Sequence, residues 1–262
     1  MSLPFAPFSR PLYVMAKPAG SLCNLRCSYC YYLEKKKLYP RSETGNRSFM
    51  SDALLEEYIR QYIEAQTMPA VMFTWHGGES LMRSPAFYRR VLQLQRKYAR
   101  AGIRIDNSIQ TNGTMLTDEW CRFFRDNGWS IDGPREFHDR YRRNPAGAGS
   151  FDDVMRGIDM LNRHGVEWNA MAVVNDCNVG HPLEFYNFFK EIDCRYLQFT
   201  PVVERIAPDG LASADDGGSC ALAPFSVTPQ AWGKFLCAVF DQWVRYDVGQ
   251  MFVQIFDATL AN

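Results

Sequence analysis

Three cysteines stand within eight residues, in the spacing Cys23-x-x-x-Cys27-x-x-Cys30. Clustered thiolates are typical ligands of zinc and of iron–sulfur clusters. A cubane of four irons held by three thiolates keeps one iron without a protein ligand, just as a catalytic zinc keeps an open position. The spacing therefore predicts a [4Fe-4S] cluster to which a small molecule can bind.

Structural zinc is the alternative for these three cysteines. Zinc usually takes four ligands, and no paired Cys or His motif in the chain supplies the fourth. The other cysteines are scattered, and a chain of this size needs no disulfide framework, so we expect a reducing compartment. Four of them lie in apolar patterns and are predicted to be buried: Cys121, Cys177, Cys194 and Cys237.

The charge balance gives no sign of a nucleic-acid or membrane partner. Twenty-nine basic residues balance 29 acidic residues among 262, so no broad electrostatic field favours either surface. The chain shows no signal-peptide pattern and no apolar stretch of about 18 residues, the length that spans a membrane. We expect a cytoplasmic protein.

Strand-like and helix-like segments alternate along the chain. The apolar runs at 12–16, 71–75, 103–109, 168–174 and 195–201 predict strands. Helical periodicity predicts helices near 52–66, 84–100, 117–127, 151–164, 182–191 and 228–246. Repeated strand–helix units indicate mostly parallel pairing and an α/β fold.

The number of repeats predicts a partial (β/α)6 TIM-like barrel, with an open doubly wound sheet as the alternative. The strand after the helix predicted at 117–127 looks shortened near Trp129 and Ser130. Residues 206–224 are rich in Gly, Ala, Asp and Pro and are predicted to be a long excursion. We therefore expect a core domain at 1–205, then a connecting excursion and a helix at 206–262.

Several motifs in the chain resemble the radical S-adenosylmethionine (SAM) superfamily. Cys23-Asn-Leu-Arg-Cys27-Ser-Tyr-Cys30 resembles its cluster signature. Four further stretches resemble one branch, the anaerobic sulfatase-maturating enzymes: His76-Gly-Gly-Glu79, Ser108-Ile-Gln-Thr-Asn-Gly113, Ser130-Ile-Asp-Gly-Pro134 and Tyr196-Leu-Gln-Phe199. The similarity spans nearly the whole chain.

This resemblance implies an oxidoreductase that uses a [4Fe-4S] cluster and SAM to oxidise a Cys or Ser of a sulfatase to Cα-formylglycine. The implied partners are the sulfatase polypeptide and an electron donor such as flavodoxin or ferredoxin. The branch carries a C-terminal domain with two further clusters, and the resemblance implies that this domain would begin beyond Asn262. The general base of the branch is expected beyond Asn262, so no catalytic base is assigned.

The resemblance also implies cofactor contacts. Gly77 and Gly78 follow a predicted strand, where the absence of side chains lets the backbone approach a ligand, and Glu79 offers a carboxylate to an ammonium group. By resemblance Gly78 contacts SAM. The alternative is that Gly77, Gly78 and Glu79 only form a tight turn.

The remaining candidate cofactor-binding residues lie in other parts of the sequence. Tyr29 could shield the cluster or contact adenine, or simply pack, and Ser130 matches a hydroxyl contact to SAM but could cap a turn. Arg142 suits the carboxylate of SAM, because a guanidinium pairs with it bidentately, with a solvated basic patch as the alternative. Val203 aligns with an adenine contact.

Other polar residues near strand ends are candidates to face a peptide. Gln110, Asn112 and Gln198 lie in or just after predicted strands, and His76 precedes the Gly-Gly-Glu motif. Two alternatives stay open for function: a radical maturase of another peptide, since cofactor motifs do not fix the substrate, or a fragment that binds cluster and cofactor without turnover.

Overall fold

A computed structural model describes residues 12–30, 32, 49–128, 130–134, 138–207, 210–211 and 221–261. These residues belong to two compact units. Unit 1 comprises Met1–Asn24, Lys35–Ile131 and Asp153–Glu167, and unit 2 comprises Leu25–Glu34, Asp132–Asp152 and Trp168–Asn262. The chain passes from one unit to the other between Cys23 and Cys27.

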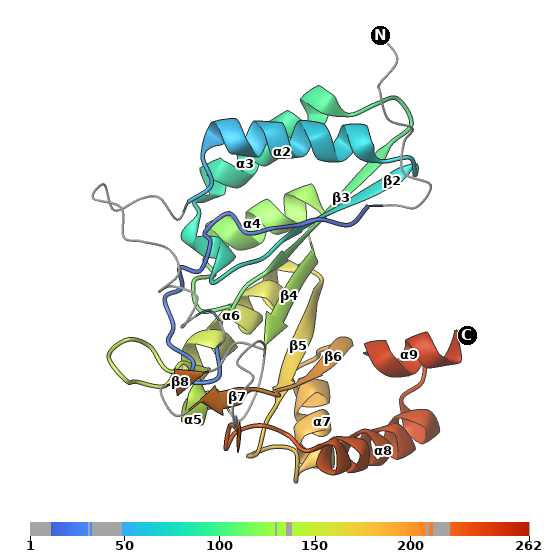
Figure 1. Ribbon diagram of the computed structural model, residues 1–262. Helices are drawn as coiled ribbons and strands as arrows, with labels where there is room; N and C mark the ends of the chain where they lie inside the picture. The colour runs from blue at the N-terminus through green and yellow to red at the C-terminus, as the bar shows by residue number, and fades with distance from the viewer. Residues whose placement is uncertain are drawn as a thin grey trace. The chain divides into compact units, whose positions relative to one another are not determined.

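Unit 1 is built on parallel strands with helices between them (Figure 1). Its strands β1 (Met15–Ala16), β2 (Ala70–Trp75) and β3 (Arg104–Gln110) pair in that order, all parallel. Its helices are α2 (Asp52–Ala65), α3 (Pro85–Tyr98), α4 (Asp118–Asn127) and most of α6 (Phe151–His164), with a short 3-10 turn, η2, at Ser80–Met82.

Local sequence signals account for where these helices begin and end. The hydroxyls of Ser51 and Thr117 accept hydrogen bonds from backbone N–H groups in the first turns of α2 and α4. Pro85 opens α3, where a missing N–H costs nothing. Gly128 ends α4 at φ +63°, a left-handed conformation that glycine adopts without strain.

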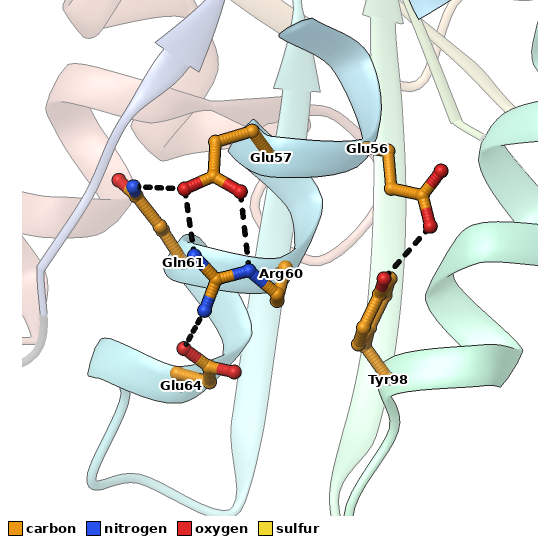
Figure 2. Close-up of polar contacts among 6 residues, drawn as sticks. All are labelled: Glu56, Glu57, Arg60, Gln61, Glu64 and Tyr98. Atoms are coloured by element: carbon orange, nitrogen blue, oxygen red, sulfur yellow. Dashed lines mark hydrogen bonds and ion pairs between the residues drawn. The ribbon is translucent and has the colours of Figure 1, made fainter. Parts of the chain in front are cut away.

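Helices α2 and α3 lie side by side and are linked at their surface (Figure 1). The Glu56 carboxylate of α2 accepts a 2.7 Å hydrogen bond from the Tyr98 hydroxyl of α3 (Figure 2). Along α2 itself, Arg60 bridges Glu57 and Glu64 one turn away on either side. Such exposed pairs contribute little to stability, so aromatic burial must hold the unit. The core rings are those of Tyr62, Phe73, Trp75, Tyr88, Trp120 and Phe124.

Unit 2 repeats the parallel arrangement. Its strands β5 (Trp168–Val174), β6 (Tyr196–Pro201) and β10 (Phe252–Val253) pair in that order, all parallel. Its helices are α5 (His138–Tyr141), α7 (Pro182–Glu191), α8 (Pro229–Tyr246) and α9 (Gln254–Leu260). Helices α7 and α8 lie side by side over a core that includes Phe185, Phe199 and Phe235 (Figure 1).

The α/β fold class with parallel strands is confirmed, and two local expectations need correction. Strand β4 spans Ser130–Pro134, so the strand expected to be shortened near residue 130 runs on through Asp132 and Gly133. The stretch predicted to be an excursion contains three short antiparallel strands, β7 (Arg205–Ala207), β8 (Gly210–Leu211) and β9 (Ala221–Leu222), in the order β8-β7-β9. Residues 208–209 and 212–220 lie outside the described residues.

Two of the four cysteines expected to be buried are not. Cys121 and Cys194 are buried, whereas Cys177 is half-buried and Cys237 is exposed on α8. The buried residues of α8 are Phe235, Val239 and Trp243. Cys237 lies on a different face of the helix, so its apolar neighbours in the sequence wrongly suggested that it is buried. The division at residues 205 and 206 stays a prediction, and β10 from the second segment pairs with β6 from the first.

No helix in the described ranges is both long and apolar enough to cross a membrane.

Candidate functional site

In unit 1 the loop that leads to Cys23 is bonded to the turn that follows β2. The Gly78 N–H donates to the Gly20 carbonyl at 2.8 Å, and the Glu79 N–H donates to the Leu22 carbonyl at 2.7 Å. These bonds bring the Gly-Gly-Glu motif against the segment immediately before the first cysteine. The position of Cys23 is therefore set by residues more than 50 positions further along the chain.

The glycine pair is required by this close approach. A Cβ at Gly78 would overlap the backbone carbonyl of Leu22, and Gly77 has φ +128°, which L side chains rarely adopt. A Cβ at Gly77 would also lie 2.8 Å from the Gly20 oxygen. The two glycines thus serve the packing of backbone on backbone, and their contact with a cofactor stays a prediction.

Glu79 is a buried carboxylate, only 1% exposed. Its Oε1 accepts hydrogen bonds from the Leu81 N–H at 2.7 Å and the Thr111 hydroxyl at 2.8 Å, and its Oε2 accepts from the Asn112 N–H at 2.7 Å. The carboxylate therefore joins the turn after β2 to the turn after β3. Its predicted role toward an ammonium group remains untested.

Cys23 belongs to a polar cluster that sequence reasoning only partly found. The Asn112 side chain donates to the Cys23 sulfur, with 3.6 Å between Nδ2 and Sγ, and to Asn24 Oδ1 at 2.8 Å. Asn112 was predicted to be a cavity residue, whereas Asn24, Thr111 and Thr114 were not singled out. A local signal existed only for Thr111 and Thr114, which lie in the polar stretch Thr111-Asn-Gly-Thr114 after β3.

His76 lies at the end of β2, half-buried. Its Nδ1 accepts a 2.6 Å hydrogen bond from the Gly77 N–H. Burial and the positive charge of Lys17 lower the pKa of His76 to about 4, partly opposed by a hydrogen bond with Gln110. The ring is therefore neutral near pH 7, and because Nδ1 accepts, the proton is assigned to Nε2.

In unit 2 the loop that carries Cys27 and Cys30 is bonded to the segment after α5. The Arg26 N–H donates to the Arg143 carbonyl at 2.8 Å, and the Ser28 N–H donates to the Tyr141 carbonyl at 2.9 Å. The Cys30 N–H closes a turn onto the Cys27 carbonyl at 2.9 Å. Both cysteines are half-buried free thiols.

Arg142 stands between the two residues that hold this loop and is 5% exposed. The alternative of a solvated basic patch is therefore wrong for this side chain. Burial raises the pKa of the Cys27 thiol, and the nearby Arg142 guanidinium offsets part of that rise. Among the described residues the buried Nε of Arg142 has no hydrogen-bond partner. A buried guanidinium with an unused donor suits an anionic ligand.

Tyr29 packs its ring edge-on against Tyr141, with 6.0 Å between centroids, and Tyr141 packs likewise against Phe225. Burial raises the pKa of the Tyr29 hydroxyl well above its usual range. Ser130 is the first residue of β4. Val203 lies after β6 and is 60% exposed. Their cofactor contacts stay predictions.

Within the described ranges, no three His, Cys, Asp or Glu side chains gather closely enough to hold one metal ion. A cubane binds each thiolate through a different iron, so its ligands need not converge on one point. The assignment of Cys23, Cys27 and Cys30 to a cluster stays a prediction. Their free thiols and the donors beside Cys23 and Cys27 are compatible with that assignment.

Known proteins similar to this chain are radical SAM proteins. The model of the Radical SAM superfamily matches residues 18–189. A serine-type anaerobic sulfatase-maturating enzyme of Bacteroides thetaiotaomicron is 62% identical over 98% of this chain. A cysteine-type enzyme of Clostridium novyi is 35% identical over 96% of it. This chain covers 63% and 65% of those two relatives, which is less than two thirds of their length.

Solved structures agree with this assignment. Native anSMEcpe with bound AdoMet and Cp18Cys peptide has a TM-score of 0.80 and 27% identity, covering 95% of this chain and 64% of that one. The coproporphyrinogen III oxidase HemN of Escherichia coli, a radical SAM enzyme, has a TM-score of 0.55 at 12% identity over 90% of this chain and 54% of its own, a likeness of fold alone. Together with the cysteine spacing and the glycine-rich turn that holds the loop before Cys23, these matches show that the chain belongs to the radical SAM superfamily.

Proposed function

We propose that this chain is the core of an enzyme that oxidises a Cys or Ser of a sulfatase to Cα-formylglycine, with SAM as the source of the oxidising radical. The observation that carries the proposal is the loop of residues 20–30, which contains the three cysteines and whose backbone is hydrogen-bonded to 78–79 and to 141–143. High identity to sulfatase-maturating relatives supports the choice of substrate class.

The proposed cluster ligands are Cys23, Cys27 and Cys30. A bound cluster with an open iron would supply the electron that cleaves SAM reductively. Within unit 1 the loop is bonded before Cys23, and within unit 2 it is bonded around Cys27, so backbone hydrogen bonds support each part of the loop. Pre-ordering of the loop lowers the conformational entropy that cluster binding would otherwise cost.

We assign SAM to the residues that follow the strands near this loop. The buried Arg142 is proposed to bind the carboxylate, since its Nε is a free donor in the described part of the chain. Gly77, Gly78 and Glu79 are proposed to approach the methionyl group, and Tyr29, Ser130 and Val203 to contact the nucleoside. Because Val203 is already exposed, an adenine could cover it without displacing the core.

The partners proposed for the whole protein are a sulfatase polypeptide and a small electron-transfer protein such as flavodoxin or ferredoxin. The names of two relatives distinguish serine-type from cysteine-type enzymes. His76 lies beside the glycine pair as a neutral ring that is hydrogen-bonded to the Gly77 N–H and to Gln110, and it stays a candidate to face the peptide. We propose residues 1–205 as the core domain and 206–262 as a connecting excursion and helix.

The test is anaerobic reconstitution with iron and sulfide, reduction with dithionite, and assay of 5′-deoxyadenosine with and without Ser- and Cys-containing sulfatase peptides. We expect iron uptake, deoxyadenosine and a mass loss on a peptide. Cys23→Ala, Cys27→Ala and Cys30→Ala should each lose the cluster, whereas Cys237→Ala, which changes an exposed thiol on α8, should keep it. Full deoxyadenosine formation by Cys27→Ala would overturn the mechanism.

A further inference from the structure

The sulfur of Cys23 accepts a hydrogen bond from the side-chain amide of Asn112. Asn112 Nδ2 lies 3.6 Å from Cys23 Sγ and 2.8 Å from Asn24 Oδ1. The amide nitrogen carries two hydrogens, so one is directed to each neighbour. All of these residues belong to unit 1.

The orientation of this amide is fixed by its other neighbour, Thr114. A backbone N–H can only donate, and that of Thr114 lies 3.0 Å from Asn112 Oδ1. The Thr114 hydroxyl also donates to Asn112 Oδ1 at 2.7 Å, while it accepts from Asn24 Nδ2 at 2.8 Å. A flipped amide would set its nitrogen against that backbone N–H, so the nitrogen must face Cys23.

The backbone of Asn112 is held just as firmly. Its N–H donates to Glu79 Oε2 at 2.7 Å, and the hydroxyl of Thr111 donates to the other oxygen of that carboxylate at 2.8 Å. Asn112 is 9% exposed and Glu79 is 1% exposed. The amide of Asn112 is therefore oriented toward Cys23 before a ligand binds to the sulfur. Little reorganisation of the protein is needed when a ligand binds.

A hydrogen-bond donor beside Cys23 affects the reduction potential of a cluster bound to that sulfur. Iron takes Cys23 as a thiolate, and a hydrogen bond to an ionised acceptor is stronger than one to a neutral acceptor. Hydrogen bonds to cluster sulfurs and ligand thiolates are among the factors that set the reduction potential. By drawing electron density from the sulfur, the amide stabilises the reduced cluster more than the oxidised one.

We propose that Asn112 is a positioning residue whose side-chain hydrogen bond to the Cys23 thiolate raises the reduction potential of the bound cluster. The inference rests on the proposed assignment of Cys23 as a cluster ligand. The step it affects is the addition of one electron from an external reductant, and the amide keeps its protons throughout.

The test is a redox titration of the full chain, loaded anaerobically and followed by electron paramagnetic resonance. In Asn112→Leu the equilibrium constant for reduction should fall about tenfold, which is about 59 mV for one electron. Asn112→Asp has the same shape but sets a carboxylate toward the sulfur, so its potential should fall further. Thr114→Val is the matched control, since it disturbs the same cluster of side chains and leaves the donor to Cys23 in place.

A second measurement detects the hydrogen bond in the wild-type protein directly. Protein labelled with ¹⁵N only in asparagine side-chain amides should show a nitrogen hyperfine coupling to the reduced cluster, and Asn112→Asp should lack it. An iron-loaded wild type without this coupling, or an Asn112→Leu chain with unaltered iron content and unaltered potential, would overturn the role of Asn112. A wild type that takes up no iron would instead overturn the cluster assignment, so the two failures are distinguishable.

Discussion

The backbone N–H of Glu79 donates a 2.7 Å hydrogen bond to the carbonyl of Leu22, one residue before the first cysteine of the cluster motif. Gly78 makes the neighbouring bond to Gly20, and nothing larger than hydrogen fits at its Cα. The Gly-Gly-Glu turn is therefore part of the support of the cysteine loop. This arrangement gives the motif a structural function beside any contact with SAM.

Gly78→Ala should destabilise the chain, because its Cβ would overlap the backbone of Leu22, which cannot move without shifting Cys23. We expect a loss of about 1–3 kcal/mol in the free energy of unfolding, the usual range for overpacking, together with lower iron uptake. Gly233→Ala is the control, since no atom lies within 4 Å of its added Cβ in α8. Its free energy of unfolding, measured by chemical denaturation, should rise by about 0.5–1 kcal/mol. Equal stability of the two variants would contradict the packing role.

Glu79→Gln should lose about 1–3 kcal/mol of unfolding free energy. The amide that replaces one carboxylate oxygen would face a backbone N–H, either that of Leu81 or that of Asn112, and leave a buried donor without an acceptor. Glu119→Gln removes an exposed ion pair with Arg89 and should change stability by less than about 0.5 kcal/mol. Urea titrations of both variants check this difference.

Arg142→Lys should weaken SAM binding by at least about tenfold, since an ammonium group cannot pair with a carboxylate bidentately. Iron content should stay at the wild-type level, because Arg142 supplies no ligand atom. Arg143→Lys is the control, as its side chain is exposed and contacts the Gly147 carbonyl. Calorimetric titration of the loaded chains with SAM measures the affinity. A wild-type affinity in Arg142→Lys would remove this residue from the SAM site.

His76 should stay neutral until well below pH 6, because burial and Lys17 lower its pKa to about 4 in the folded chain. An unfolded chain takes up this proton near the ordinary value of about 6.5. The stabilising contribution of neutral His76 is therefore complete above about pH 6.5 and is lost as the pH falls toward 4.

The measurement for His76 is the difference in unfolding free energy between wild type and His76→Gln across that range. We expect the unfolding free energy of the wild type to decrease relative to that of His76→Gln as the pH falls from 7 to 4. His181→Gln, which changes a histidine whose side chain is 58% exposed, is the surface control. A flat profile for His76→Gln would mean that the ring titrates normally.

The sequence determined the elements and the type of chemistry. The helices predicted at 151–164 and 182–191 and the strand at 168–174 have those bounds in the structure. Hydrophobic period, and a helix-start signal such as Pro182, act within a few positions of the chain. The triplet Cys23, Cys27 and Cys30 lies within one short segment, so its spacing could be interpreted without a fold.

Tertiary structure alone decided which residues surround those cysteines. Asn112 is 89 positions from Cys23, and the contact between Gly78 and the Leu22 backbone depends on the pairing of β1 with β2. The burial of Arg142 and the exposure of Cys237 likewise follow from how elements pack. Local patterns carry period and composition but neither strand register nor the approach of distant turns, and these long-range relations set the environment of each thiol.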